Sequence, residues 1–159
     1  MSDSIKNLKN KLADFQIQIK KDGEELFKEV FKELFDQHPI LEKVYFTAFT
    51  PHFSDGDENI YSRNDMYPVF IRESLPEDFK KSYDDENWSY LGYELEYAKS
   101  LSEEQAKAYE ALSKLDSNLS GMGDVFKTIF GDHIAVLATR EGFEVNEYDH
   151  DWKEKIIIL

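Results

Sequence analysis

Residues 35–63 constrain the fold of this chain most strongly, because a helix end, a strand and a tight turn follow one another there. Pro39 disfavours helical geometry at His38, so the preceding helix must end at this point. Residues 44–49 place β-branched and aromatic side chains at both phases of a two-residue period, which is typical of a strand with one buried and one partly buried face. The acidic turn at 54–57 contains a glycine that is free to take positive φ. This stretch therefore predicts a strand that turns back on itself.

The return strand is expected to begin near Ile60 and to resume around 67–71. Pro68 has no N–H to donate, so it predicts an edge strand or an interruption. Residues 133–139 and 143–148 predict a second pair of strands, joined by a turn with a glycine at a position that tolerates positive φ. The tail that follows can add a short strand.

The chain before this stretch predicts helix, with two apolar stripes. The first stripe has alternating steps of three and four residues and consists of Ile5, Leu8, Leu12, Phe15 and Ile19. The second is wider and consists of Leu26, Phe27, Val30, Phe31, Leu34 and Phe35. Gly23 weakens the pattern and Asp22 can cap a new helix, so a break is expected there. We expect the first stripe to face the core; alternatively, residues 1–22 form a helical arm for self-association, because the spacing is close to that of a coiled-coil seam.

Two more helices are predicted in the second half of the chain. Ser102 and Gln105 have the spacing of a capping box. The apolar positions of the helix that follows are Ala106, Tyr109, Leu112 and Leu115. A short helix over 125–130 is expected to stop at Gly131. Together these elements predict one α+β domain over residues 1–159, in which helices cover one face of an antiparallel sheet of about four strands.

An acidic, aromatic insert over residues 72–104 carries ten acidic residues against four basic ones. Tyrosine and tryptophan rings bring large contact areas with a polar tip, which is common in protein interfaces. The residues proposed to bind a partner are Asp84, Asp85, Glu86, Trp88, Tyr90, Tyr93, Glu94 and Tyr97. The alternative is that the insert is an irregular lid on the open side of the sheet.

The charge of the chain narrows the classes of partner. It has 33 acidic and 19 basic residues, a net charge of −14. Such a surface repels nucleic acids and anionic membranes, so a basic protein is the expected partner. There is no cysteine, hence no disulfide and no thiolate ligand. The N-terminal sequence lacks the pattern of a secretory signal, so a cytoplasmic protein is expected.

Some Asp and His side chains stand at the predicted strand ends and turns. If the two strand pairs place these ends together, they can hold a divalent cation. The residues concerned are Asp55, Asp57, His133, Asp149 and His150. An EF-hand is excluded, because Ile60 stands where the loop needs glycine and Met66 where it needs glutamate. No nucleophile elbow and no phosphate-binding loop is found, so no catalytic residue and no cofactor is predicted.

Two blocks of this sequence resemble a family of small acidic proteins of tailed bacteriophages. The blocks are Phe35-x-x-His38-Pro39 with Thr50-Pro51-x-Phe53-x-Asp55-Gly56-Asp57, and Phe130-Gly131-Asp132-His133 with Thr139-Arg140-x-Gly142 and Tyr148-x-His150-Asp151. The chain departs from the family pattern at His52 and Ser54. The resemblance implies a phage origin, with the host cytoplasm as the compartment, and a fold. It implies no activity.

These observations leave three hypotheses for the function. The first is a non-enzymatic phage accessory protein that binds a basic or nucleic-acid-binding host protein through its acidic surface, and so inhibits it. The second is a metal-dependent hydrolase that acts on a phosphorylated small molecule through its Asp and His residues. The third is a structural protein that self-associates through its N-terminal helix.

Overall fold

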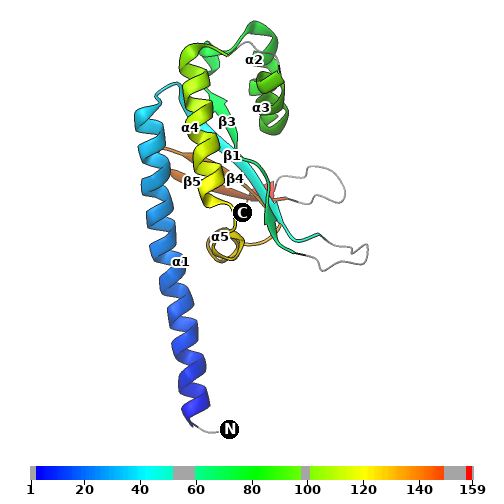
Figure 1. Cartoon of the computed structure of the whole chain (residues 1–159). Helices are drawn as coiled ribbons and strands as arrows, with labels where there is room; N and C mark the ends of the chain where they lie inside the picture. Colours follow the sequence, from blue (N-terminus) through cyan, green and yellow to red (C-terminus); the bar gives the residue numbers. More distant parts are fainter. Residues whose placement is uncertain (1–2, 52–59, 98–100, 149–156, 159) are drawn as a thin grey trace.

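The computed structural model describes residues 3–51, 60–97, 101–148 and 157–158, and it has an α+β fold (Figure 1). The elements in chain order are α1 (Asp3–Gln37), β1 (Leu41–Phe49), β2 (Ser62–Arg63), β3 (Tyr67–Phe70), the short 3₁₀ helix η1 (Arg72–Ser74), α2 (Glu77–Asp84), α3 (Trp88–Tyr97), α4 (Glu103–Leu119), α5 (Gly123–Phe130), β4 (Ile134–Thr139), β5 (Gly142–Glu147) and β6 (Ile157–Ile158). The predicted fold class and long N-terminal helix are confirmed.

The sheet is antiparallel and is built around β1. One edge of β1 pairs with β4, with Phe46 opposite Val136. The other edge pairs first with β3 and then with β2, and Pro68 lies in β3, opposite Val44. Strand β5 pairs with β4, and β6 pairs with β5. Both predicted strand pairs are therefore present, Pro68 lies in an outer strand as expected, and the tail adds the short β6.

Phenylalanine rings join the helices to one face of the sheet. The ring of Phe46 on β1 meets Phe126 and Phe130 of α5 edge-on, at centroid distances of 5.6 and 5.7 Å. On α1, the ring centroid of Phe27 lies 5.0 Å from that of Phe126, and the ring centroid of Phe31 lies 5.7 Å from that of Phe143 on β5. Edge-to-face pairs of this kind add about 0.5–1.5 kcal/mol each to the free energy of area burial. Helices α1 and α5 are thus fixed to the sheet and to each other by one aromatic cluster.

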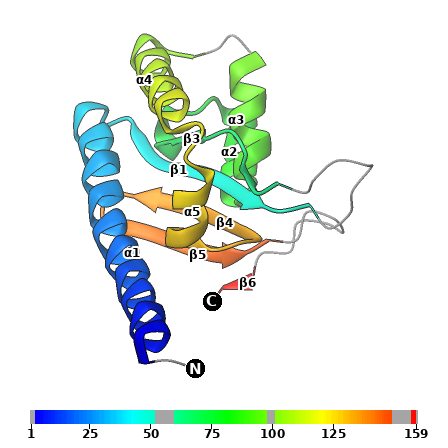
Figure 2. The ribbon, with the colours of Figure 1, turned by 60° about the horizontal axis from the view of Figure 1, so that its bottom comes forward.

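The other face of the sheet is covered at its β3 side by the insert (Figure 2). The insert is helical, since it forms α2 and α3. Trp88, Leu91 and Leu95 of α3 are buried. A Cβ on Gly92 would lie 2.7 Å from Cδ1 of Tyr67 on β3, so the glycine allows the close approach of helix and strand. Most of the insert therefore covers the sheet, as the lid alternative expects. It does so as two helices and not as an irregular segment.

Helix α1 is continuous through Gly23, so the predicted break is wrong. A Cβ at this position would lie 2.6 Å from Cδ1 of Ile129 on α5, and Ile129 is buried. The glycine is therefore a contact point between two helices and not a helix end.

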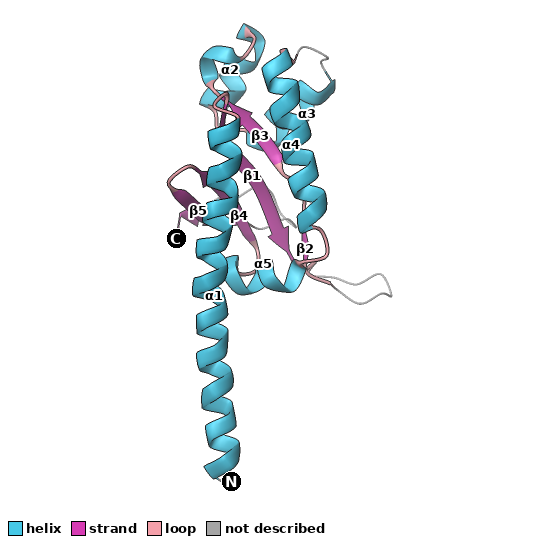
Figure 3. Cartoon of the chain, turned by 60° about the vertical axis from the view of Figure 1, so that its left-hand side comes forward, coloured by secondary structure: helices cyan, strands magenta, loops and turns pink. Residues whose placement is uncertain are grey.

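Figure 3 shows that the N-terminal half of α1 extends beyond the rest of the molecule. None of the described helices, α1 included, combines the length and the apolar character needed to cross a membrane.

The predicted capping box at the start of α4 is confirmed. The Ser102 hydroxyl accepts a hydrogen bond from the Gln105 amide, and the Gln105 side chain accepts one from the Ser102 amide. The side-chain amide of Gln105 also donates to Ser74, so this buried residue ties α4 to η1. The predicted apolar phase of α4 is wrong at one point, because Ala106 is exposed and Ala108 is buried.

We expect Gly23→Ala to lower the free energy of unfolding, because overpacking against Ile129 costs about 1–3 kcal/mol and alanine regains only about 1 kcal/mol of helix propensity. Ile129→Val removes the atom in the way. In that background, Gly23→Ala should cost at least about 1 kcal/mol less than in the wild type. Urea denaturation of the four proteins measures this coupling, and additive changes would mean that the close approach does not matter.

Candidate functional site

The first apolar stripe of α1 is exposed, so the expectation that it faces the core is wrong. Its five side chains, Ile5, Leu8, Leu12, Phe15 and Ile19, are between 39% and 63% exposed. Beyond them, Leu26 is 61% exposed and Val30 is 37% exposed. These seven residues, which we call the α1 stripe, recur at steps of three, four and seven, so they lie on one side of the helix.

The buried face of α1 is a different one. It consists of Phe27, Phe31, Leu34 and Phe35, all near the C-terminal end of the helix. With about 100° of rotation per residue, these side chains point roughly a quarter turn away from the α1 stripe. The stripe therefore stays open both on the free arm and where α1 is seated on the sheet. Exposed large apolar side chains in a line are uncommon on a solvated helix.

The charges of α1 are divided along its length. Residues 3–21 contain five lysines and two aspartates, whereas residues 22–37 contain six acidic residues and two lysines. The arm is thus positive on a chain whose net charge is −14.

Two of the partner-binding residues predicted in the acidic, aromatic insert make contacts within the fold. Asp84 is held by Arg72, which donates two hydrogen bonds of 2.8 and 2.9 Å, and this bonding lowers the pKa of the Asp84 carboxyl. Trp88 is 4% exposed and packs edge-on against Tyr83. Two of the proposed partner-binding residues therefore have structural roles. The others in the described part of the insert, Asp85, Glu86, Tyr90, Tyr93 and Glu94, are at least partly exposed, while the side chain of Tyr97 lies outside the described part.

Glu86 also ends a helix. It has a φ of 58°, its amide donates to the carbonyl of Tyr83, and the amide of Asn87 donates to the carbonyl of Ser82. This is the Schellman arrangement that terminates helices, usually with glycine at the left-handed position. The positive φ of Glu86 is therefore explained by the end of α2.

The metal-site hypothesis gains no support. Asp55, Asp57, Asp149 and His150 lie outside the described residues. His133 is at the start of β4, and its ring stacks on that of Phe49 at 6.5 Å. No group of three or more His, Asp or Glu residues that could hold a metal ion occurs among the residues that the structure describes.

Asp132, next to His133, joins two strands. Its carboxylate accepts hydrogen bonds from the amide and the hydroxyl of Thr50, at 2.8 and 2.7 Å, and from the amide of His133 at 2.9 Å. Burial by itself would raise the pKa of the Asp132 carboxyl, but these hydrogen bonds outweigh burial and lower it. The residue fixes the end of β1 to the start of β4.

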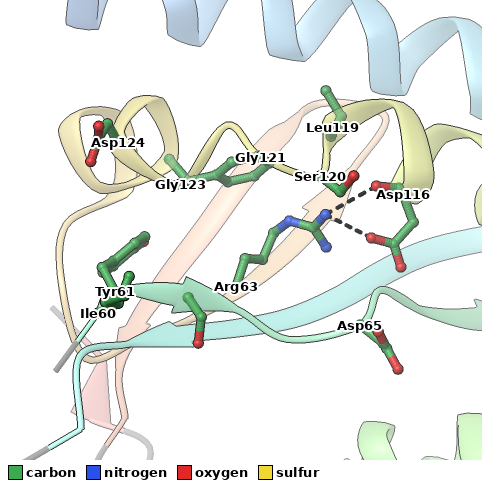
Figure 4. Close-up of a pocket in the computed structure, with 12 residues that line it drawn as sticks. Ile60, Tyr61, Arg63, Asp65, Asp116, Leu119, Ser120, Gly121, Gly123 and Asp124 are labelled. Carbon is green, nitrogen blue, oxygen red and sulfur yellow. Dashed lines mark hydrogen bonds and ion pairs between the residues drawn. The ribbon is translucent and has the colours of Figure 1, made fainter. Parts of the chain in front are cut away.

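A hollow of about 430 Å³ lies between β2 and the ends of α4 and α5 (Figure 4). Its central charge is Arg63, which forms an ion pair of 2.6 Å with Asp116 and donates a hydrogen bond to the Asp116 carbonyl. The other carboxylate oxygen of Asp116 accepts from the amide of Met66, and the guanidinium lies over the ring of Phe126 at 5.0 Å. Arg63 is thus fully engaged in holding the β2 edge to α4, and its ion pair with Asp116 is structural.

A smaller cavity, of about 220 Å³, lies on the sheet face that α3 only partly covers. Its walls include Lys43, Trp88, Glu86, Glu144 and Asn146. The Lys43 ammonium lies 5.2 Å from the centre of the Trp88 ring. Asn146 is 4% exposed, and its Oδ1 accepts no hydrogen bond from the described residues. A buried amide oxygen of this kind needs a donor from water or from a ligand.

Comparison of the chain with protein families, with curated proteins and with solved structures gives no significant match in any of the three. The resemblance to phage proteins therefore stays a prediction.

From the sequence, the exposure of the first apolar stripe was only the alternative to a core-facing helix. The spacing of its residues suits both a core-facing helix and a coiled-coil seam. Nothing in the sequence signalled the cavity, since its walls come from β1, β4, β5 and α3.

We expect Asp132→Asn to lower the free energy of unfolding at pH 7 by about 1–2 kcal/mol, because hydrogen bonds to a charged acceptor are lost. The folded-state pKa is lowered. The carboxylate therefore stabilises the fold above its unfolded pKa of about 3.9, and this stabilisation is lost as the pH falls through the folded pKa. The difference between variant and wild type should be smaller at pH 3 than at pH 7 in urea denaturation. Asp14→Asn on the exposed arm is the control, and an equal difference at both pH values would contradict the role of the Asp132 charge.

We expect Asn146→Leu to raise the free energy of unfolding by about 1 kcal/mol, because it removes a buried acceptor that lacks a donor. Asn146→Asp should lower it, because a charge is then buried. Thermal denaturation of the two variants and the wild type measures both changes. A less stable leucine variant would show that bound water satisfies the amide.

Proposed function

We propose that this protein acts by binding a helix of a protein partner along the α1 stripe, and that it is not an enzyme. The observation that carries the proposal is the line of seven large apolar side chains exposed along α1. Apolar side chains that recur every three and four residues are the pattern by which one helix packs on another. A partner helix would remove this surface from water.

The shape of the molecule supports the proposal. Burial on α1 begins at Phe27, so about 20 residues of helix stand free of the sheet (Figure 3). An isolated helix of that length is marginally stable in water, and most helices in proteins depend on the packing of an apolar face. A partner on the stripe would supply that packing.

The cavity at Asn146 favours a second candidate function, the capture of a basic side chain. Two carboxylates, Glu86 and Glu144, stand at its walls beside the buried Oδ1 of Asn146 and the ring of Trp88. The ring already holds the ammonium of Lys43, which is the contact that a lysine or arginine of a partner would make. Under this proposal the partner is a basic, nucleic-acid-binding protein of the host of a phage, and its binding weakens strongly with salt.

The test of the stripe uses tagged full-length protein and variants without a change in charge. We expect the double variant Leu12→Gln with Phe15→Gln to capture at least about tenfold less partner than the wild type. Each apolar side chain buried in the interface contributes about 1.5–3 kcal/mol to the binding free energy. The captured proteins, including untagged copies of this chain, are quantified by mass spectrometry.

Ile17→Gln is the matched control. Ile17 is 68% exposed on the same arm but points away from the α1 stripe. It should leave the captured amount within about twofold of the wild type. Equal capture by the stripe variant and the wild type would refute the proposal.

A further inference from the structure

We infer that the α1 stripe binds a second copy of this chain, with the two α1 helices antiparallel. This inference rests on the proposed function, because it names the partner of the same surface. It adds the orientation of the two helices, their register and the ion pairs that fix both.

The stripe has the order of a heptad seam. With Ile5 at position a, the a positions are Ile5, Leu12, Ile19 and Leu26, and the d positions are Leu8, Phe15, Asp22 and Glu29. The seam is therefore apolar at its N-terminal end and acidic at two d positions near its C-terminal end. When two helices pair along this seam, the pairing is more stable if Asp22 and Glu29 do not face the same residues of the partner helix.

The division of charge along α1 decides the orientation. In a parallel pair, Asp22 and Glu29 would each face their own copy, and the lysine-rich arms would lie side by side. Like charges so placed are destabilising. In an antiparallel pair with Leu26 opposite Leu8 of the partner subunit, residues 3–12, with three lysines and one aspartate, lie along residues 22–31, with four acidic residues and one lysine. The helix is thus complementary to its own reverse and not to itself in parallel.

The seam also fixes the register. In an antiparallel pair, a positions pack against d positions, and g positions flank g positions. Pairing Leu26 with Leu8 of the partner subunit places Phe15 beside Ile19 of the partner subunit. The same register brings Lys11 to Glu25 of the partner subunit, and by symmetry the pair forms twice. A shift of one heptad that shortens the overlap would leave Leu26 and Glu25 without these contacts.

The neighbouring structure leaves room for such a helix. Leu26 and Val30 stay exposed on the part of α1 that is seated on the sheet, and Glu25, Glu29 and Glu33 are exposed as well. Helix α5 contacts α1 at Gly23 and Phe27, next to the stripe. Because the stripe side chains stay exposed beside α5, a second helix can pack on them.

The area is sufficient for a dimer. At roughly 150–250 Å² for a large apolar side chain, the exposed fractions of the seven stripe residues amount to about 600 Å² per helix. Two copies would bury about 1,200 Å², which is the lower end of the range for specific interfaces.

Sedimentation equilibrium of the full-length protein at low salt tests the ion pairs. The wild type should sediment as a dimer. Lys11→Glu and Glu25→Lys should each raise the dissociation constant about tenfold, because each places two like-charge pairs in the interface. The double variant should return to within about threefold of the wild type, because the exchanged pair is again complementary. Lys21→Glu, on the far side of the arm, is the control for net charge and should have little effect.

A single spin label tests the orientation, because the chain has no cysteine of its own. With a label on Ser4→Cys, the antiparallel register separates the two labels by about 40 Å along the helix axis. A parallel pair would hold them within about 20 Å.

Two results would overturn the inference. One is a monomer at all protein concentrations up to about 100 μM. The other is a dimer with the short distance between labels. A double variant as weak as the single ones would overturn the register. A monomer that still loses a foreign partner on Leu12→Gln with Phe15→Gln would leave the proposed function standing, whereas failure of the capture test together with a monomer would remove both.

Discussion

The seating of α1 on the sheet is the interaction on which the rest of the structure depends. Phe27 and Phe31 reach α5 and β5, and Arg140 at the end of β4 donates to the carbonyl of Phe35 and pairs with Asp36. Gly23 lets α5 come close enough for these contacts to form. One helix thus fixes the position of α5 and of the strand pair formed by β4 and β5.

The seat is shorter than the helix, and this mismatch links the fold to the proposed function. A helix rises about 1.5 Å per residue, so the free 20 residues project about 30 Å. A helix that is surrounded by water on all sides is expected to carry polar side chains around its whole circumference. The arm instead has a line of apolar side chains and an excess of lysine. Both features are explained if a second helix covers it.

Several polar residues in this chain invite a functional interpretation and turn out to hold elements together. Asp132 fixes β1 to β4, Arg63 and Asp116 fix β2 to α4, and Gln105 fixes α4 to η1. The sheet has short outer strands, and β2 has only two residues. Strands of that length make few ladder hydrogen bonds, so side-chain bonds from neighbouring helices are needed to hold the edge.

The sequence by itself determined the α+β class, both strand pairs, the edge position of Pro68 and the capping box of α4, because local rules of periodicity and turn chemistry govern these features. Only the tertiary structure decided that α1 runs unbroken through Gly23, that its first stripe is exposed, and that Trp88 and Asp84 serve the fold. The physical reason is that a periodic apolar face states only that something must cover it. Whether that cover is the chain's own sheet or another molecule depends on where the sheet ends, and here it ends near Phe27.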